Sequence, residues 1–84
     1  MTDIAKIIEK EHEINALLEK NQLFGEVYSD SNLPIIYIKI DGDWKHDHLF
    51  LASLLKENGY SYIGNHITSS DSSDSYEAVH SVIV

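Results

Sequence analysis

Hydrophobic residues near the start of the chain recur at spacings of three and four positions. A helical repeat of 3.6 residues places side chains at these spacings on one face. Lysines and glutamates fill the positions in between. The pattern predicts an amphipathic helix over residues 3–20, whose apolar stripe consists of Ile4, Ile7, Ile8, Ile14, Leu17 and Leu18.

Two short segments follow whose residue pattern is typical of β-strands. Residues 23–28 and 33–40 are rich in β-branched and aromatic residues, and residues 29–32 between them are all turn formers. In the second segment Ile36, Ile38 and Ile40 alternate with Ile35, Tyr37 and Lys39. Because successive side chains of a strand point to opposite faces, we expect the triplet at 36, 38 and 40 to face the core.

A second helix is predicted from Asp43 to Asn58. Asp43 is the expected N-cap, and Asn58-Gly59 is a stop signal because glycine readily adopts the left-handed conformation that ends helices. Helical spacing puts an apolar stripe on one side of this segment, widened by Leu49, Phe50 and Leu54. The stripe consists of Trp44, His48, Leu51 and Leu55.

The last third of the chain predicts two more strands. Residues 60–67 alternate, with Tyr60, Tyr62, Gly64 and His66 on one side and Ser61, Ile63, Asn65 and Ile67 on the other. Residues 76–84 fit two structures. The spacing of Tyr76, Val79, His80 and Ile83 suits a helix, whereas the β-branched end Val82-Ile83-Val84 favours a strand.

With a strand over 76–84, the element order becomes α-β-β-α-β-β. The chain then has enough apolar residues to bury one face of the sheet under two helices. We therefore predict an α+β two-layer sandwich in one domain, residues 1–84, with a four-stranded, mainly antiparallel sheet and both helices on one face.

Composition narrows the classes of function. The chain has 14 acidic residues, six lysines and no arginine, and its net charge is −8. This balance argues against direct binding to nucleic acid and against a polybasic membrane contact. There is no cysteine, which excludes disulfides and thiolate zinc sites. With no signal-peptide pattern and no long apolar run, we expect a cytoplasmic protein, in the host cytoplasm if a virus encodes it.

The stretch 41–48 is the richest in potential metal ligands. Asp43, His46, Asp47 and His48 offer oxygen and nitrogen donors, with His66 and His80 as more distant candidates. His46 and His48, however, point about 200° apart on a helix and cannot share one ion. A capping aspartate and half-exposed histidines explain the same residues, so we predict no metal site.

No catalytic motif is recognisable. The serines lack a Gly-x-Ser-x-Gly turn, and the four glycines are isolated rather than gathered in a phosphate-binding loop. We therefore predict that the protein is not an enzyme and has no cofactor.

Two features predict binding to another protein. Residues 57–84 contain Glu57, Asp71, Asp74 and Glu77 but no lysine. The Ser/Asp tract at 68–75 can be an ordinary solvated hairpin loop, a weak calcium site, or an acidic recognition loop. The five tyrosines lie on or beside predicted strands, so some should face away from the helices. Tyrosine is a frequent interface anchor. The predicted partner-binding residues are Asp71, Asp74, Glu77, Tyr37, Tyr62 and Tyr76.

The leading hypothesis is a small, acidic, non-catalytic protein that covers the basic surface of a larger protein. A virus-encoded, phage-type inhibitor of a nucleic-acid-binding protein is one concrete form of it. A metal-dependent small-molecule binder or enzyme that uses the Asp/His cluster is one alternative. A structural homo-oligomer, such as a homodimer, is another, because the first helix and the sheet edges could pair with a second copy.

Overall fold

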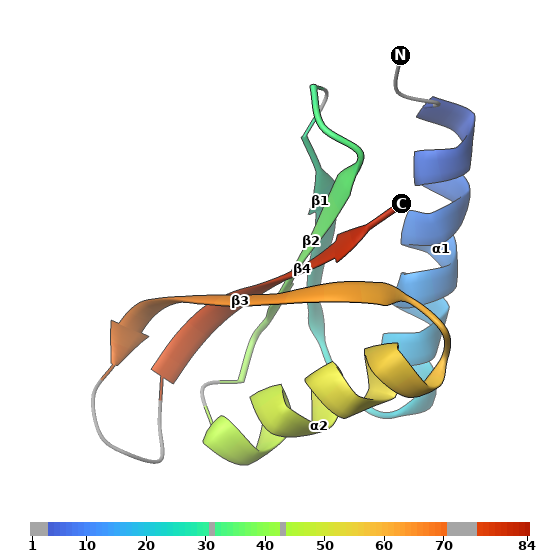
Figure 1. The fold of residues 1–84 in the computed structure, drawn as a ribbon. Helices are drawn as coiled ribbons and strands as arrows, with labels where there is room; N and C mark the ends of the chain where they lie inside the picture. Colours follow the sequence, from blue (N-terminus) through green and yellow to red (C-terminus); the bar gives the residue numbers. More distant parts are fainter. Residues whose placement is uncertain (1–3, 31, 43, 71–75) are drawn as a thin grey trace.

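The computed structural model describes residues 4–30, 32–42, 44–70 and 76–84. Six elements follow one another in the order α-β-β-α-β-β, as predicted (Figure 1). The final segment is a strand and not a helix. The elements are α1 (Ile4–Lys20), β1 (Gly25–Ser29), β2 (Ile35–Ile40), α2 (Lys45–Glu57), β3 (Ser61–Ser70) and β4 (Tyr76–Ile83).

The four strands form one antiparallel sheet in the order β1-β2-β4-β3. Each half of the chain contributes a hairpin, and the two hairpins join through their second strands. In this central pairing Ile36 lies opposite Val82 and Ile38 lies opposite His80. The sheet is strongly twisted, so that β1 and β2 run roughly along α1 while β3 and β4 run roughly along α2 (Figure 1).

Both helices pack on the same face of the sheet, which confirms the predicted two-layer arrangement. The isoleucine triplet of β2 is buried as expected, together with Ala78 and Val82 of β4. From the helices, the buried side chains that meet this face are Ile7, Ile14, Leu18, Leu51, Leu54 and Leu55. Burying each such side chain contributes about 1.5–3 kcal/mol, so this single apolar layer holds the fold together.

The start of α2 differs from the prediction. Its N-cap is Trp44, whose side chain makes no capping hydrogen bond, so the assignment of Asp43 as N-cap was wrong; Asp43 lies outside the described residues. Trp44 has an extended backbone (φ −69°, ψ 129°) and therefore does not follow the helical period. Its side chain is 63% exposed instead of buried in the stripe. Leu49 and Phe50 are exposed too, so α2 is covered on one side only.

The predicted end of α2 is confirmed. Asn58 is the C-cap, and its backbone N–H donates to the carbonyl of Leu54. Gly59 follows with φ +82°, a left-handed conformation that side chains with a Cβ adopt at a cost.

Replacing Gly59 with alanine is therefore expected to lower the free energy of unfolding by about 1 kcal/mol. An added Cβ would meet no atom within 4 Å, so the loss comes from the backbone conformation and not from a clash. Urea unfolding followed by circular dichroism measures it. Gly59→Asn is the control, since asparagine tolerates this conformation better and should lose less. Equal losses for both variants would contradict this explanation.

Two irregularities in β3 change which face its side chains occupy. The register with β4 shifts between Tyr62 and Gly64 and again between Ile67 and Ser69. An extra residue at such a bulge reverses the alternation that follows it. His66 consequently pairs with Val79 on the uncovered face, whereas Tyr62 pairs with Val82 on the covered face. The sequence-based prediction that Tyr62 and His66 share a face was wrong for this reason.

Candidate functional site

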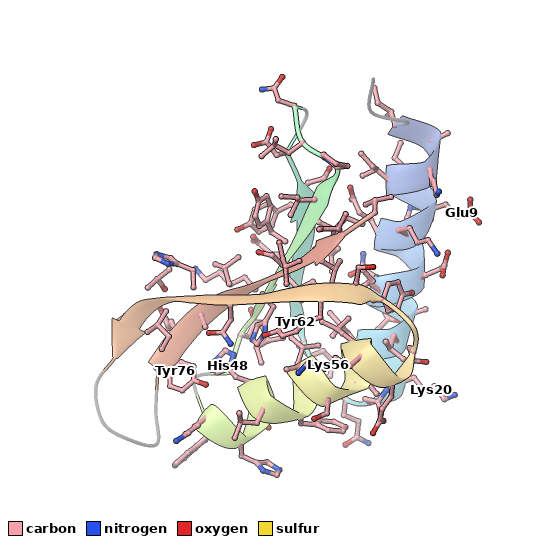
Figure 2. All side chains as sticks on the ribbon, viewed as in Figure 1. Glu9, Lys20, His48, Lys56, Tyr62 and Tyr76 are labelled. Carbon is pink, nitrogen blue, oxygen red and sulfur yellow. The ribbon has the colours of Figure 1, made fainter. Side chains whose placement is uncertain are left out.

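Among the described residues, two histidines are the polar side chains that are buried in the core. His48 of α2 and His80 of β4 are at most 1% exposed. Nδ1 of His48 lies 2.9 Å from Nε2 of His80, and Nε2 of His48 lies 3.0 Å from the backbone carbonyl oxygen of Tyr76. Figure 2 shows that His48 points from α2 toward the β3–β4 hairpin, in the layer that also holds Tyr62 and Tyr76.

The hydrogen-bond partners determine where the protons are. A carbonyl only accepts, so Nε2 of His48 carries a proton and its Nδ1, in the neutral ring, accepts from Nε2–H of His80. Nδ1 of His80 then accepts from the Tyr62 hydroxyl at 3.1 Å, and that hydroxyl oxygen accepts from the Asn65 amide at 3.2 Å. All four bonds run in one direction, from Asn65 to the Tyr76 carbonyl. We call these five residues the histidine chain.

The surroundings favour an uncharged imidazole at His80. Burial, and secondarily the neighbouring His48, lowers the pKa of His80 to about 4. The Tyr76 ring stacks on His48 with centroids 4.8 Å apart. The Lys56 ammonium lies 5.5 Å from the centre of the Tyr62 ring, which adds a positive charge nearby. His80 is therefore neutral at pH 7.

The histidine chain is a closed network, which limits its chemistry. A histidine that acts as a general base needs a free lone pair directed at a substrate. Here both ring nitrogens of each histidine already have protein partners, and the chain ends on a backbone carbonyl that cannot pass a proton on. Among the described residues, every buried side-chain nitrogen or oxygen has a hydrogen-bond partner. The arrangement orients α2 and the β3–β4 hairpin relative to each other.

The candidate metal ligands do not come together. His48 is buried, whereas His46 is exposed, so the two point apart as the helical geometry predicted. His66 lies across the sheet from His80, on the opposite face. Asp47 lines a shallow hollow beside Phe24, and Asp43 lies outside the described residues. In the part of the chain that the structure describes, no three such side chains are grouped closely enough to hold a metal ion.

The predicted partner-binding residues divide between the two faces. Tyr62 and Tyr76 are half-buried on the helix-covered face, within the histidine chain. Tyr37 and Glu77 lie on the uncovered face, as the register with Tyr28 and Ser69 shows. Asp71 and Asp74 lie outside the described residues.

The uncovered face of the sheet carries a group of apolar side chains. Tyr28 and Tyr37 stack across β1 and β2 with ring centroids 5.5 Å apart. Ile35 lies opposite Ile83 in the neighbouring pair of strands. Ile63, at the first bulge of β3, is 54% exposed, and Ile83 is 44% exposed. We call these five residues the open face. The sequence pattern indicated the tyrosines but did not indicate that Ile63 would lie on the same face.

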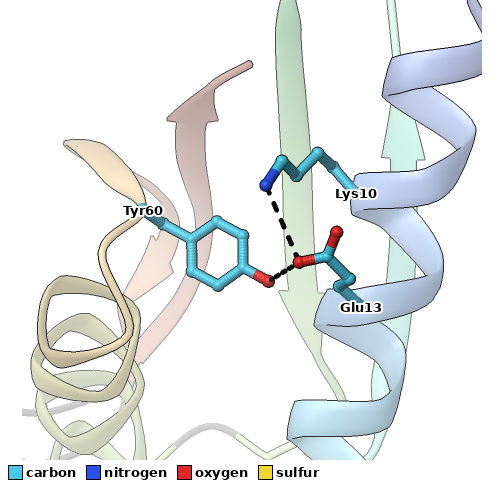
Figure 3. A network of polar contacts seen from close by, with 3 residues as sticks. All are labelled: Lys10, Glu13 and Tyr60. Carbon is cyan, nitrogen blue, oxygen red and sulfur yellow. Dashed lines mark hydrogen bonds and ion pairs between the residues drawn. The ribbon is translucent and has the colours of Figure 1, made fainter.

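A second polar network lies on the surface between α1 and the residue before β3 (Figure 3). The Tyr60 hydroxyl donates to Oε1 of Glu13 at 3.2 Å, and Nζ of Lys10 lies 3.7 Å from the same oxygen. Burial, followed by the charge and hydrogen bond of Glu13, raises the pKa of Tyr60. Lys10 also lines a hollow of about 210 Å³ between α1 and the end of β4. Ligand pockets typically measure about 300–1,000 Å³, so this one is small for a metabolite.

Comparison of the chain with protein-family models, with curated protein sequences and with solved structures found no match. Among the described residues, neither helix combines the length and apolar character needed to cross a membrane. Function must therefore be inferred from the geometry and the charge of this chain itself.

Proposed function

We propose that this protein is a small, acidic, non-catalytic module that binds a larger protein through the open face of its sheet. The observation that carries the proposal is that face itself. Two stacked tyrosines and three isoleucines lie on this face, and no helix or strand of the described residues covers it. Apolar groups of this kind, with aromatic anchors, are typical of protein-binding surfaces.

Charge indicates the kind of partner. Five of the six lysines lie on the helices, at positions 6, 10, 20, 45 and 56. On the sheet side the remaining lysine, Lys39, pairs across the strands with Glu26, and Glu77 adds a further negative charge. A protein of net charge −8 is attracted to a basic surface and repelled by an acidic one. We therefore propose a basic protein surface as the partner; a nucleic-acid-binding protein inhibited by a viral product is one concrete case.

The closed histidine chain supports the non-catalytic part of the proposal. Its imidazoles link α2 to the β3–β4 hairpin and have no lone pair free for a substrate. Tyr62 and Tyr76 belong to this chain, so we place the binding role on Tyr37 and its neighbours instead of on all the tyrosines of the sheet.

The proposal predicts that truncating the open face removes binding. The immobilised full chain is used to capture proteins from lysate at about 0.05 M salt, and the affinity of the captured protein is then measured by calorimetry. Ile63→Ser is expected to weaken binding about tenfold or more, since exposed apolar anchors carry much of the energy of such interfaces. Higher salt should weaken binding further.

Leu49→Ser is the matched control, because Leu49 is 56% exposed but lies on α2, away from the sheet face. It should leave the affinity within about threefold. Equal losses for both variants, or binding unaffected by salt, would contradict the proposal. Sedimentation of the chain alone provides a further test: a dimer that Ile63→Ser dissociates would mean that a second copy, and not a basic partner, occupies the open face.

A further inference from the structure

We propose that the His48–His80 pair is a pH-sensitive lock, which holds the β3–β4 hairpin against α2 at neutral pH and weakens this contact in acid. The inference goes beyond the proposed function and does not depend on it. It starts from the position of the pair, which joins residues of α2, β3 and β4 that lie far apart in the sequence.

An additional proton changes the direction of hydrogen bonds in the histidine chain and charges a buried ring. A proton on Nδ1 of His80 reverses the 3.1 Å hydrogen bond to Tyr62, because the hydroxyl oxygen then accepts and its own hydrogen loses its acceptor. A proton on Nδ1 of His48 is accommodated when the proton of His80 moves from Nε2 to Nδ1, which causes the same reversal at Tyr62. Either way, proton uptake leaves the Tyr62 hydrogen without its acceptor and places a positive charge on rings that are at most 1% exposed, at the contact between α2 and the hairpin.

The groups around the pair do not compensate the added charge. From α2, His80 faces His48, and the Lys56 ammonium lies close by over the Tyr62 ring. From β3 it faces the Tyr62 hydroxyl, and from β2 it lies opposite the apolar Ile38. Tyr76 of β4 itself stacks on His48. Within the described residues, no carboxylate is hydrogen-bonded or ion-paired with either ring. A charged imidazole here is both desolvated and without a counter-ion.

The direction of the pH effect follows from this. An unfolded histidine takes up a proton near pH 6.5, whereas the pKa of His80 in the folded protein is lowered to about 4. Between these two values the unfolded chain binds the extra proton and the folded one does not. The contribution of His80 to the free energy of unfolding is therefore fully present above about pH 6.5. It decreases as the pH falls toward 4 and does not change further below that.

Nuclear magnetic resonance of the ¹⁵N-labelled full chain tests the proton positions. Long-range proton–nitrogen correlations at pH 7 should show both rings as neutral tautomers with the proton on Nε2. His80 should stay neutral as the pH is lowered to 5, with the exposed His12, His46 and His66 observed in the same spectra. A proton on Nδ1 of either ring at pH 7, or a charged His80 at pH 6, would overturn the inference.

The unfolding experiment uses His80→Gln, which keeps a neutral side chain with a donor but does not titrate. Urea midpoints are measured from pH 7.5 to pH 4. The natural chain should lose stability as the pH falls through 6.5, and His80→Gln should lose clearly less over the same range. His66→Gln, on the exposed face, is the control and should behave as the natural chain does. An unchanged pH profile for His80→Gln would refute the lock; if that variant fails to fold, the spectra decide.

Discussion

Replacing Leu51 with alanine is expected to lower the free energy of unfolding by about 3 kcal/mol. Leu51 is fully buried on α2 and belongs to the core that the helices share with β2 and β4. Its truncation removes apolar contacts and leaves a cavity in the single apolar layer of the fold. Domains of this size have total stabilities of about 4–12 kcal/mol, so this loss is a large part of the whole. Urea unfolding at pH 7.5 measures it.

Leu49→Ala is the matched control for this prediction. It lies two residues earlier on the same helix, so the change in helix propensity is the same, but its side chain is 56% exposed. We expect a change within about 0.5 kcal/mol. If Leu49→Ala were as costly as Leu51→Ala, the assignment of the buried and exposed sides of α2 would be wrong.

The second large effect is expected at Gly25, the first residue of β1. A Cβ added there would lie 2.2 Å from the carbonyl oxygen of Lys39 and 2.5 Å from the Cα of Ile40. Both are backbone atoms of the neighbouring strand, so relief requires β1 to move away from β2. Gly25→Ala should therefore cost about 2–3 kcal/mol. Hydrogen exchange should show amides of β1 losing protection while those of β3 and β4 keep it.

Gly42→Ala separates this clash from the general cost of losing a glycine. The nearest atom to a Cβ at Gly42 is Oδ2 of Asp47 at 3.1 Å, the end of a side chain that can turn away. We expect a change within about 0.5 kcal/mol. If the amides of β1 keep their protection from hydrogen exchange in Gly25→Ala, the two strands are not in close contact at this point.

Much of the fold could be predicted because local patterns and global packing agree. The isoleucine triplet of β2 and the spacing of Ile7, Ile14 and Leu18 on α1 each indicate one buried face, and the structure buries them against each other. The bulges of β3 could not be predicted, because an extra residue in a strand depends on its partner. That is why Tyr62 and His66 lie on opposite faces against expectation.

The histidine pair was within reach of sequence reasoning but was missed. His48 lay on the predicted apolar stripe of α2, and in a strand His80 alternates with Ala78 and Val82, both of which are buried. Two histidines whose side chains face the core must form hydrogen bonds with each other or with other polar groups. What the sequence lacked was the pairing of β2 with β4, which places His80 in the middle of the sheet, above α2.

The central pairing of β2 with β4 also bears on how the chain folds. Each hairpin can form from neighbouring residues, but an isolated hairpin is marginal in water. The two become one sheet only when Ile35 meets Ile83 and Ile36 meets Val82, partners separated by more than half of the chain. Closing so long a loop costs entropy before any contact is gained. We therefore expect the joining of the two hairpins to limit the folding rate.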